Sequence, residues 1–232
     1  METVVITGAS RGIGAALARE YGEAGARVVV CARSESALES VAADVEAAGG
    51  EAVTQRADVR DEYDVERLLE TAARAASQDG GIDAVFANAG VYHGVPGETP
   101  LAEESYSAFD EHLRVNGRGV FATVREAVPH LAADARVVVP SGRIAREPKP
   151  GFGSYAVSKA LAEAVAQQFA AELDNPVGVV DPGQVSSELT NGAQGRDPTD
   201  VAPMFRWAAQ EADPEALDGN VLSLRDWKKA TR

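Results

Sequence analysis

The chain has 232 residues, 45% of them hydrophobic and 25% charged, so it can bury a substantial core and is not an intrinsically disordered protein. Its 22 lysine and arginine residues stand against 36 aspartate and glutamate residues, which gives a formal net charge of −14. An electrostatic field of this sign repels nucleic acids and anionic membrane surfaces, so neither is an expected partner.

Short β-branched segments alternate with alanine-rich segments along the chain. The short segments are too uniformly apolar for half-exposed strands and predict buried parallel strands. The intervening segments carry Ala, Leu, Glu and Arg at helical spacing and predict helices. The predicted strands are 3–7, 27–31, 51–55, 82–86, 135–139, 176–180 and 220–224, and the predicted helices lie near 12–24, 35–48, 61–77, 103–131, 154–173 and 199–210.

Repeated strand–helix units predict an α/β fold. Parallel strands need right-handed crossovers, which place helices on both faces of the sheet. We therefore expect a single domain over residues 1–232, built on a doubly wound parallel sheet of about seven strands. Ligands of such sheets bind beyond the carboxyl ends of the strands, so functional residues are expected directly after each strand.

A glycine-rich turn, Thr7-Gly-Ala-Ser-Arg-Gly-Ile-Gly14, joins the first predicted strand to the first predicted helix. Its glycines permit a tight turn, and the N–H groups at the start of the helix can hold a pyrophosphate. The position between strand and helix favours dinucleotide binding over a merely flexible turn. The predicted contacts are Gly8, Ser10, Arg11, Gly12, Ile13 and Gly14.

The spacing Thr-Gly-x3-Gly-x-Gly resembles that of the short-chain dehydrogenase/reductase family, and the resemblance spans residues 3 to about 224. A Tyr-x3-Lys pair alone arises easily by chance, whereas a whole series of motifs in family order does not. The resemblance implies a Rossmann-like fold and further cofactor-binding residues. They are Asp58 and Val59 at the adenine, Asn88, Ala89 and Gly90 behind the cofactor, and Pro182, Gly183, Val185 and Ser187, with Ser187 at the nicotinamide.

The residues after the second predicted strand bear on the choice of coenzyme. An acidic residue there would accept hydrogen bonds from the 2′-hydroxyl of NAD and repel the 2′-phosphate of NADP. Ala32 takes that place, and Arg33 follows it. Arg33 and Arg11 can hold a phosphate by charge-assisted hydrogen bonds. The sequence therefore predicts NADP(H) rather than NAD(H), and the alternative is that Arg33 caps a surface loop.

Tyr155 and Lys159 lie four residues apart on a predicted helix, so their side chains share a face. A phenol titrates at about 10 in water, and we expect the neighbouring ammonium to lower its pKa so that Tyr155 acts as acid or base. By resemblance, Lys159 also holds the nicotinamide ribose, and Asn116 positions a water that links Lys159 to solvent. The alternative for Asn116 is a polar residue that kinks its helix.

The family also has a serine after the fifth strand that polarises the substrate oxygen. Its usual place, thirteen residues before the tyrosine, is taken here by Gly142, and Ser141 lies one residue earlier. Either the loop 143–154 carries one extra residue and Ser141 is this hydroxyl, or the hydroxyl is missing. Because loops absorb single insertions readily, we favour Ser141. Ser154 and Ser158 are weaker substitutes because they lie beside Tyr155 on its helix.

A short polar segment near 188–198 predicts a small lid over an open substrate pocket, with Tyr92, His93 and Phe152 as candidate lining residues. The helices predicted at 103–131 and 154–173 correspond to those that pair subunits in family tetramers. This correspondence implies a homotetramer or a homodimer, and a monomer surface is the alternative.

The lone cysteine, Cys31, can form no internal disulfide and lies in an apolar strand. No apolar run approaches the roughly 18 residues of a membrane helix, and no secretion signal precedes the first strand, so we expect a cytoplasmic protein. The three histidines show no metal-ligand spacing, so no metal is expected. Few lysines and dispersed acidic residues suggest a halophilic source, with an ordinary acidic protein as the alternative.

The leading interpretation is an NADP(H)-dependent oxidoreductase that transfers a hydride between the nicotinamide and a ketone, a 3-oxoacyl group or a secondary alcohol. Its predicted catalytic residues are Tyr155, Lys159, Ser141 and Asn116. The alternative is a regulatory protein that binds NADP but has lost its chemistry, which the displaced Ser141 makes conceivable. A scaffolding protein is disfavoured because it gives no reason for the glycine turn, Tyr155 and Lys159 to occur together.

Overall fold

Seven parallel strands form one sheet in the computed structural model, which describes residues 1–76, 80–190, 192 and 194–232. The strands are β1 (Thr3–Thr7), β2 (Arg27–Ala32), β3 (Glu51–Arg56), β4 (Ile82–Phe86), β5 (Leu131–Pro140), β6 (Val177–Asp181) and β7 (Val221–Ser223). Their order is β3-β2-β1-β4-β5-β6-β7, so the winding direction reverses between β1 and β4. The predicted α/β fold with a doubly wound parallel sheet is confirmed.

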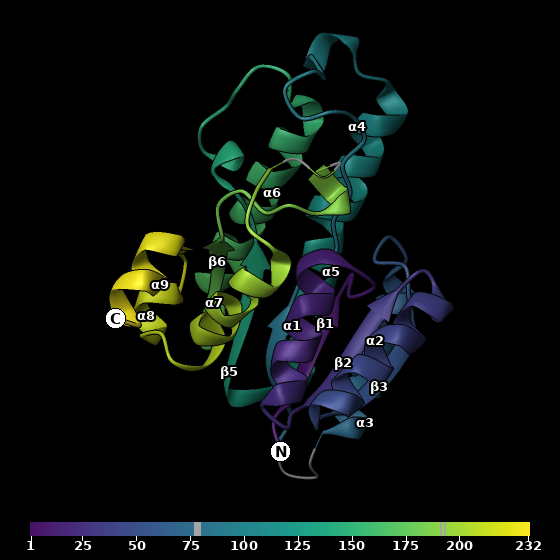
Figure 1. Ribbon diagram of the computed structural model, residues 1–232, viewed down its shortest axis with the longest axis vertical. Coiled ribbons are helices and arrows are strands. Elements are labelled where there is room, and N and C mark those ends of the chain that lie inside the picture. The colour runs from purple at the N-terminus through teal and green to yellow at the C-terminus, as the bar shows by residue number, and fades with distance from the viewer. Residues whose placement is uncertain (77–79, 191, 193) are drawn as a thin grey trace.

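Helices cover both faces of this sheet, and the strands run upward in Figure 1, with their carboxyl ends toward the top. On one face pack α1 (Gly12–Glu23), α2 (Glu35–Ala48) and α7 (Pro198–Gln210), and on the other α3 (Glu62–Ala75), α5 (Gly119–Ala127) and α6 (Gly153–Ala170). The remaining helices are α4 (Tyr106–His112), α8 (Pro214–Leu217) and α9 (Leu224–Ala230). None of the helices in the described residues is both long and apolar enough to span a bilayer.

Two hydrophobic clusters, one on each face of the sheet, make up the core. Successive residues of a strand point to opposite faces, so Val4 and Ile6 of β1 join one cluster while Val5 joins the other. Cys31 lies fully buried in β2, and burial raises the pKa of its thiol to about 12. The edge strand β3 departs from the prediction, because its side chains are exposed or half-buried where no strand covers them.

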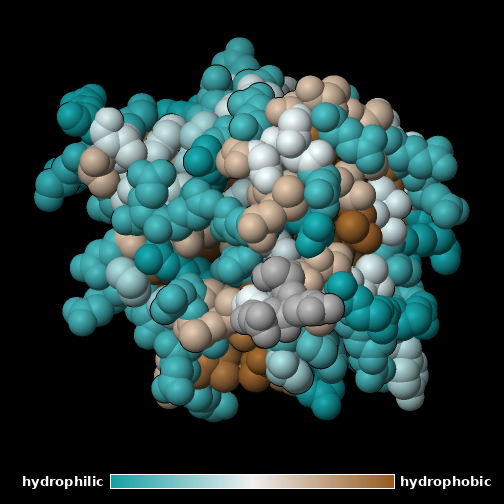
Figure 2. All heavy atoms as spheres, turned by 90° about the horizontal axis from the view of Figure 1, so that it is seen from below, coloured by the Kyte–Doolittle hydropathy of each residue, from teal (hydrophilic) through white to brown (hydrophobic). Residues whose placement is uncertain are grey.

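The amino ends of the strands lie at the lower end of the molecule. Seen from below, that surface is mostly hydrophilic and is interrupted only by small apolar patches (Figure 2). Such a surface agrees with the acidic composition of the chain.

The single helix predicted over 103–131 is wrong. The structure divides this stretch into α4, a π-helical segment (Leu113–Arg118), α5 and a 3-10 turn (Val128–His130) that contains Pro129. Pro129 lacks the N–H that an α-helix needs, so α5 ends before it. Strand β5 then begins at Leu131, which pairs with Ile82 of β4 across an irregular register, four residues before the predicted start at 135.

The other predicted boundaries lie within three residues of those observed, and the predicted helix end at 77 falls outside the described residues. Two helices, α8 and α9, were not predicted from the sequence. Both are short: α8 begins with Asp213 capping Pro214–Leu217, and α9 begins with a capping box between Ser223 and Asp226. These capping residues were the sequence signal that could have revealed the two helices.

Side-chain hydrogen bonds tie the ends of β1 and β4 together where the winding reverses. Asn88 Nδ2 donates to the carbonyl oxygens of Thr7 and Gly8 at 2.8 and 3.2 Å. Thr7 Oγ1 donates to the carbonyl of Phe86 at 3.3 Å and accepts from the N–H of Ala89 at 3.1 Å. The glycine turn after β1 is therefore held against the segment after β4.

We expect Asn88→Asp to destabilise the fold. The substitution keeps the side-chain volume but removes both N–H donors and places a carboxylate against two carbonyl oxygens. Loss of these partners should lower the free energy of unfolding by about 1–3 kcal/mol, measured by urea titration. The matched control is Gln167→Glu, the same amide-to-acid change at an exposed position of α6. Equal unfolding free energies in the two variants would contradict this assignment.

Candidate active site

Two adjoining cavities lie at the carboxyl ends of the strands. The first, of about 210 Å³, is lined by the glycine turn and the ends of β2, β3 and β4, and we call it the narrow cavity. The second, of about 1160 Å³, is lined by the segments after β5 and β6 and by α9, and we call it the wide cavity. Ile13, Ser141, Tyr155, Ser187 and Leu189 line both, so the cavities meet at these side chains.

The structure brings almost all of the predicted site residues to these cavities. Of the predicted catalytic and cofactor-binding residues, only Gly14 lines neither. Pro182, Gly183 and Val185 line the wide cavity alone. The narrow cavity is lined by Gly8, Ser10, Arg11, Gly12, Ile13, Arg33, Asp58, Val59, Asn88, Ala89, Gly90, Asn116, Ser141, Tyr155, Lys159 and Ser187.

The glycine turn is shaped for close contacts. Gly8 has a φ of 66°, and a Cβ there would lie 2.6 Å from Ala89 Cα. A Cβ on Gly14 would lie 2.6 Å from both the Gly8 carbonyl oxygen and Asn88 Nδ2, which explains why Gly14 is needed although it lines no cavity. No described side chain caps α1, so its first N–H groups are available as donors, and this cradle fits a pyrophosphate.

Charged side chains surround the outer end of the narrow cavity. Arg11 forms an ion pair with Glu188, and both side chains are exposed. Arg33 is exposed at the end of β2. Asp58 accepts from Arg60 Nε at 2.9 Å, and this guanidinium lowers the pKa of the Asp58 carboxyl. Arg11 and Arg33, the two cations predicted to hold a 2′-phosphate, both line the narrow cavity.

Asn116 lies in the π-helical segment Leu113–Arg118. Short π-helical turns within helices frequently occur at functional sites. Its side-chain amide makes two hydrogen bonds with the backbone of Val91: Oδ1 accepts from the N–H at 2.8 Å, and Nδ2 donates to the carbonyl at 2.9 Å. Nδ2 also donates to Ser158 Oγ at 2.8 Å. Asn116 thus joins the segment after β4 to α6, and its predicted link through a water to Lys159 remains a prediction.

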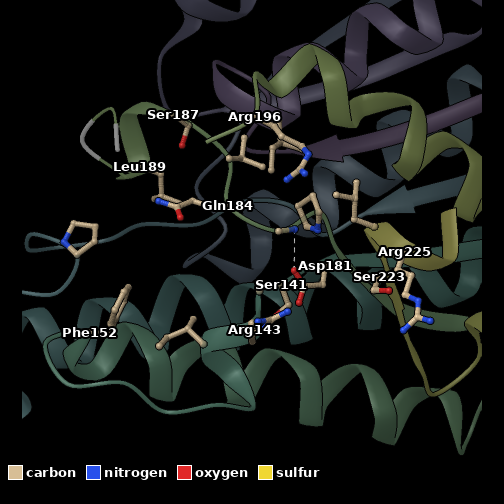
Figure 3. A pocket seen from close by; sticks show the side chains of 18 of the residues that line it. Ser141, Arg143, Phe152, Asp181, Gln184, Ser187, Leu189, Arg196, Ser223 and Arg225 are labelled. Atoms are coloured by element: carbon tan, nitrogen blue, oxygen red, sulfur yellow. Dashed lines mark hydrogen bonds between the residues drawn. The ribbon is translucent and has the colours of Figure 1, made fainter. Parts of the chain in front are cut away.

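Ser141 directly follows β5, and its backbone N–H donates to the Val180 carbonyl at 2.9 Å. Its side chain is buried, and Oγ has no hydrogen-bond partner among the described residues. A buried hydroxyl without a partner is unfavourable unless a ligand supplies one. Figure 3 shows Ser141 on the wall of the wide cavity close to Asp181. Gly142, the other candidate position, offers only backbone.

The two serines considered as substitutes are occupied elsewhere. Ser154 donates from Oγ to Glu104 Oε1 at 2.7 Å, and its Oγ lies 2.6 Å from Nδ1 of the buried His112. Ser158 donates to the Tyr155 carbonyl at 2.8 Å. Ser141 is therefore the one of these three serines whose hydroxyl is unpaired in the described structure.

Tyr155 is half-buried, near the start of α6, and its ring stacks on Tyr92 with the ring centroids 4.5 Å apart. Burial raises the pKa of the phenol to about 12, and the nearby Tyr92 acts in the same direction. The predicted lowering by an adjacent ammonium is therefore wrong for this structure, because the loss of hydration of the phenolate outweighs any attraction to Lys159. A phenol with this pKa stays protonated at neutral pH and is available as a hydrogen-bond donor.

Lys159 lies one turn further along α6, and its Nζ donates to the Pro140 carbonyl at 2.6 Å. Burial lowers the pKa of its ammonium to about 8, whereas the carboxylates of Glu163 and Asp181 act in the opposite direction. The amine is thus fixed beside the end of β5, with a pKa well below that of a lysine in water.

An ion network that the sequence analysis missed lies behind Lys159. Arg146, in the loop after β5, donates to Glu163 Oε1 at 2.6 Å and also to Asp181 at the end of β6. Both carboxylates are largely buried, so the guanidinium compensates two charges that would otherwise be costly to bury. Glu163 lies four residues after Lys159, and this helical spacing was the available sequence signal.

The predicted substrate-pocket residues are only partly brought together. Tyr92 and Phe152 line the wide cavity, whereas His93 packs against His112 with the ring centroids 5.2 Å apart. Of the predicted lid, residues 191 and 193 lie outside the described residues. Its described part includes Leu189 and Arg196 at the cavity, and Val185 and Arg196 form a β-bridge. Within the described ranges, no cluster of three or more His, Cys, Asp or Glu residues is arranged to hold a metal.

The family model described as short chain dehydrogenase matches residues 2–197. A short chain dehydrogenase/reductase from Aspergillus aculeatus is 34% identical over 81% of this chain and 70% of that protein. Glycine betaine reductase from Emericella nidulans is 31% identical over 97% of this chain, which spans only 19% of the length of that protein.

Among solved structures, an alcohol dehydrogenase from the archaeon Thermococcus sibiricus, complexed with 5-hydroxy-NADP, superposes with a TM-score of 0.84. It is 27% identical to this chain, and the match covers 97% of this chain and 96% of that one. This chain thus shares its fold, over almost its whole length, with a protein whose structure was solved in complex with a dinucleotide.

Proposed function

We propose that this chain, which belongs to the short chain dehydrogenase family, is an NADP(H)-dependent reductase of small-molecule carbonyl compounds that can also run in reverse on secondary alcohols. The observation that carries the proposal is the meeting of two cavities at Tyr155 and Ser141, where a protonated phenol and an unpaired buried hydroxyl share one wall. A site with two convergent hydroxyl donors fits a carbonyl oxygen.

The residues of the narrow cavity fit a dinucleotide. The cradle of Gly8 and Gly14 leaves no room for a Cβ, and the uncapped N-terminus of α1 favours an anion. Asp58 and Val59 would hold the adenine end, and Lys159 with Ser187 the nicotinamide end. When bound, the coenzyme supplies a hydride for the carbonyl carbon.

The chain's own groups handle the proton and the oxygen. Ser141 Oγ donates a hydrogen bond to the carbonyl oxygen and so polarises the bond, while the Tyr155 phenol gives its proton to the same oxygen as negative charge develops there. Lys159 in its ammonium form stabilises the resulting phenolate, and Tyr92 fixes the ring of Tyr155 by stacking. In the reverse direction the same groups would take the proton from an alcohol.

The alternative of a regulatory protein without chemistry has less support. It was motivated by the offset of Ser141, and the buried hydroxyl of Ser141 lies at the cavity wall without a partner among the described residues. A homodimer or homotetramer remains our expectation. Its support is a set of exposed apolar side chains on α5 and α6 and in the 3-10 turn that follows α5, namely Phe121, Val128, Val157 and Leu161.

Replacing Tyr155 by Phe should abolish NADPH-dependent turnover, by at least about a hundredfold, because the proton donor is lost while the ring and its stacking on Tyr92 remain. Coenzyme affinity, measured by fluorescence titration, should change little. The matched control is Tyr106→Phe, which removes a hydroxyl from an exposed ring of α4. Turnover of Tyr155→Phe at the rate of Tyr106→Phe would rule the assignment out.

The pH profile of carbonyl reduction should follow Lys159. Reduction needs its ammonium form, whose pKa is about 8, and the protonated phenol, whose pKa of about 12 lies outside the working range. The ammonium is present below its pKa and lost above it. Hence kcat/KM should be flat below about pH 8 and fall roughly tenfold per pH unit above it.

A variant of Glu163 tests the origin of this profile. Glu163→Gln keeps an oxygen for Arg146 but removes a carboxylate that raises the pKa of Lys159, so the fall should begin at lower pH. The exposed Glu172→Gln should leave the profile unchanged. A fall that begins at the same pH in both variants would show that another group controls the profile.

Coenzyme preference should depend on Arg33. We expect Arg33→Gln to lower the ratio of kcat/KM for NADPH to that for NADH by roughly tenfold or more, since a charge-assisted hydrogen bond is worth about 1.5–3 kcal/mol. Arg74→Gln, at an exposed arginine of α3 that lines neither cavity, is the control. A ratio in Arg33→Gln equal to that in the control would favour the surface-loop interpretation of Arg33.

A further inference from the structure

The wide cavity has a charge opposite to that of the protein. Acidic residues outnumber basic ones by 36 to 22 in the whole chain, yet among the described residues that line this cavity Asp181 is the only acidic one. The basic lining residues are Arg143, Lys149, Arg196, Arg225, Lys228, Lys229 and Arg232. The field inside the cavity therefore attracts anions although the molecule as a whole repels them.

The positions of the lysines also indicate that positive charge is concentrated at the cavities. The chain has four lysines: three of them line the wide cavity, and the fourth is Lys159 in the narrow cavity. In a chain that otherwise uses arginine for its positive charges, this placement is not explained by surface composition. It is explained if the cavity must offer flexible point charges to a ligand.

These cations converge from separate parts of the chain. Arg143 follows β5, Arg196 precedes α7, and Arg225 belongs to α9, and Figure 3 shows their side chains around the same hollow as Ser141. On α9, Lys228 and Lys229 follow Arg225 by three and four residues, so the three side chains share one face of the helix. The fold thus places a helix face of like charges at the cavity.

The charges of this helix face are only partly offset by nearby acids, since Asp226 of α9 interacts electrostatically with Arg225 and Lys229. Arg143 pairs with Glu147 at 3.8 Å, but Arg225, Lys228 and Lys229 take part in no ion pair within the described part of the chain. The single acid, Asp181, is bound by Arg146 and accepts from the N–H of Gly183 at 3.0 Å. Three cations on one helix face repel one another, and a bound anion would relieve that repulsion.

We propose that the substrate carries an anionic group, a carboxylate or a phosphate, that binds to Arg225, Lys228 and Lys229 while its carbonyl group lies between Ser141 and Tyr155. This inference rests on the proposed function and names its substrate class. The wide cavity, at about 1160 Å³, has room for a chain that joins the two groups. The cations occupy a cavity wall, which favours a small anionic molecule over an acidic protein partner.

Kinetics on matched substrates test the proposal. The rates of NADPH oxidation are compared for straight-chain oxo acids, oxo-alkyl phosphates and the methyl esters of the same oxo acids. The wild-type protein should prefer one or both anionic series over the esters by at least about tenfold in kcat/KM, mainly through KM, and added salt should reduce the preference. Whether the carboxylates or the phosphates are preferred identifies the anion.

The triple variant Arg225→Gln/Lys228→Gln/Lys229→Gln should lose this preference and keep its activity on the esters, because none of the three residues contributes to the proton chemistry. Arg74→Gln serves as the control for loss of a surface charge. Equal rates for acids, phosphates and esters in the wild-type protein would overturn the proposal. A preference that survives in the triple variant, or one seen only when the oxoacyl group is attached to an acidic carrier protein, would also overturn it.

A binding measurement separates this inference from the proposed function. Suberate, a dicarboxylate without a reducible carbonyl, is titrated against the protein with its diamide as the neutral control, and the fluorescence of Trp227 in α9 reports binding. We expect saturable binding of suberate alone, and its loss in the triple variant. Such binding in a protein without reductase activity would uphold the anion site while refuting the proposed function. Equal responses to suberate and the diamide would refute the anion site.

Discussion

The tie between the ends of β1 and β4 is the constraint on which the site depends. Parallel strands leave their carboxyl ends at one edge of the sheet, and the reversal of winding opens a crevice between two neighbouring strands. Asn88 and Thr7 hold the two sides of that crevice together through four hydrogen bonds. This junction positions the glycine turn and the uncapped start of α1 that follows it. The narrow cavity, which Tyr155 also lines, is formed against this turn.

Burial controls the chemistry of the groups that carry the proposed reaction. The same loss of hydration raises the pKa of Tyr155 and lowers that of Lys159, so both move toward their neutral forms. The carboxylates of Glu163 and Asp181 counteract this effect on Lys159, and Arg146 compensates their own burial. The result is a phenol that keeps its proton, one helical turn from an amine whose pKa is lowered to about 8.

Charge is distributed over this protein on two scales. Over the whole surface, acidic residues dominate and give the negative net charge. At the wide cavity the sign is reversed, because segments distant in the chain each contribute cations to one wall. The net charge therefore describes the solvent-exposed surface but says nothing about a ligand, which experiences the local field of a concave site.

The sequence by itself determined the fold class, because strand periodicity and glycine placement depend on local stereochemistry: the φ of Gly8 and the register of β1 are properties of a few adjacent residues. It also indicated which residues follow the strands, and all of the predicted catalytic and cofactor-binding residues except Gly14 line the two cavities. The sequence offered a helix kink at Asn116 only as an alternative, and the structure places a π-helical segment there, at Leu113–Arg118. The partner of Asn116, the backbone of Val91, was not visible in the sequence because it lies on a distant segment.

Tertiary structure alone decided the environment of each group. The direction of the pKa shift of Tyr155 depends on how much protein covers it, and the partners of Lys159 depend on where β5 and β6 end. That the hydroxyl of Ser141 is unpaired, and that the cations of α9 reach the same cavity as Arg196, are facts about segments far apart in the chain. Such long-range contacts follow from packing of the whole sheet, which no local pattern encodes.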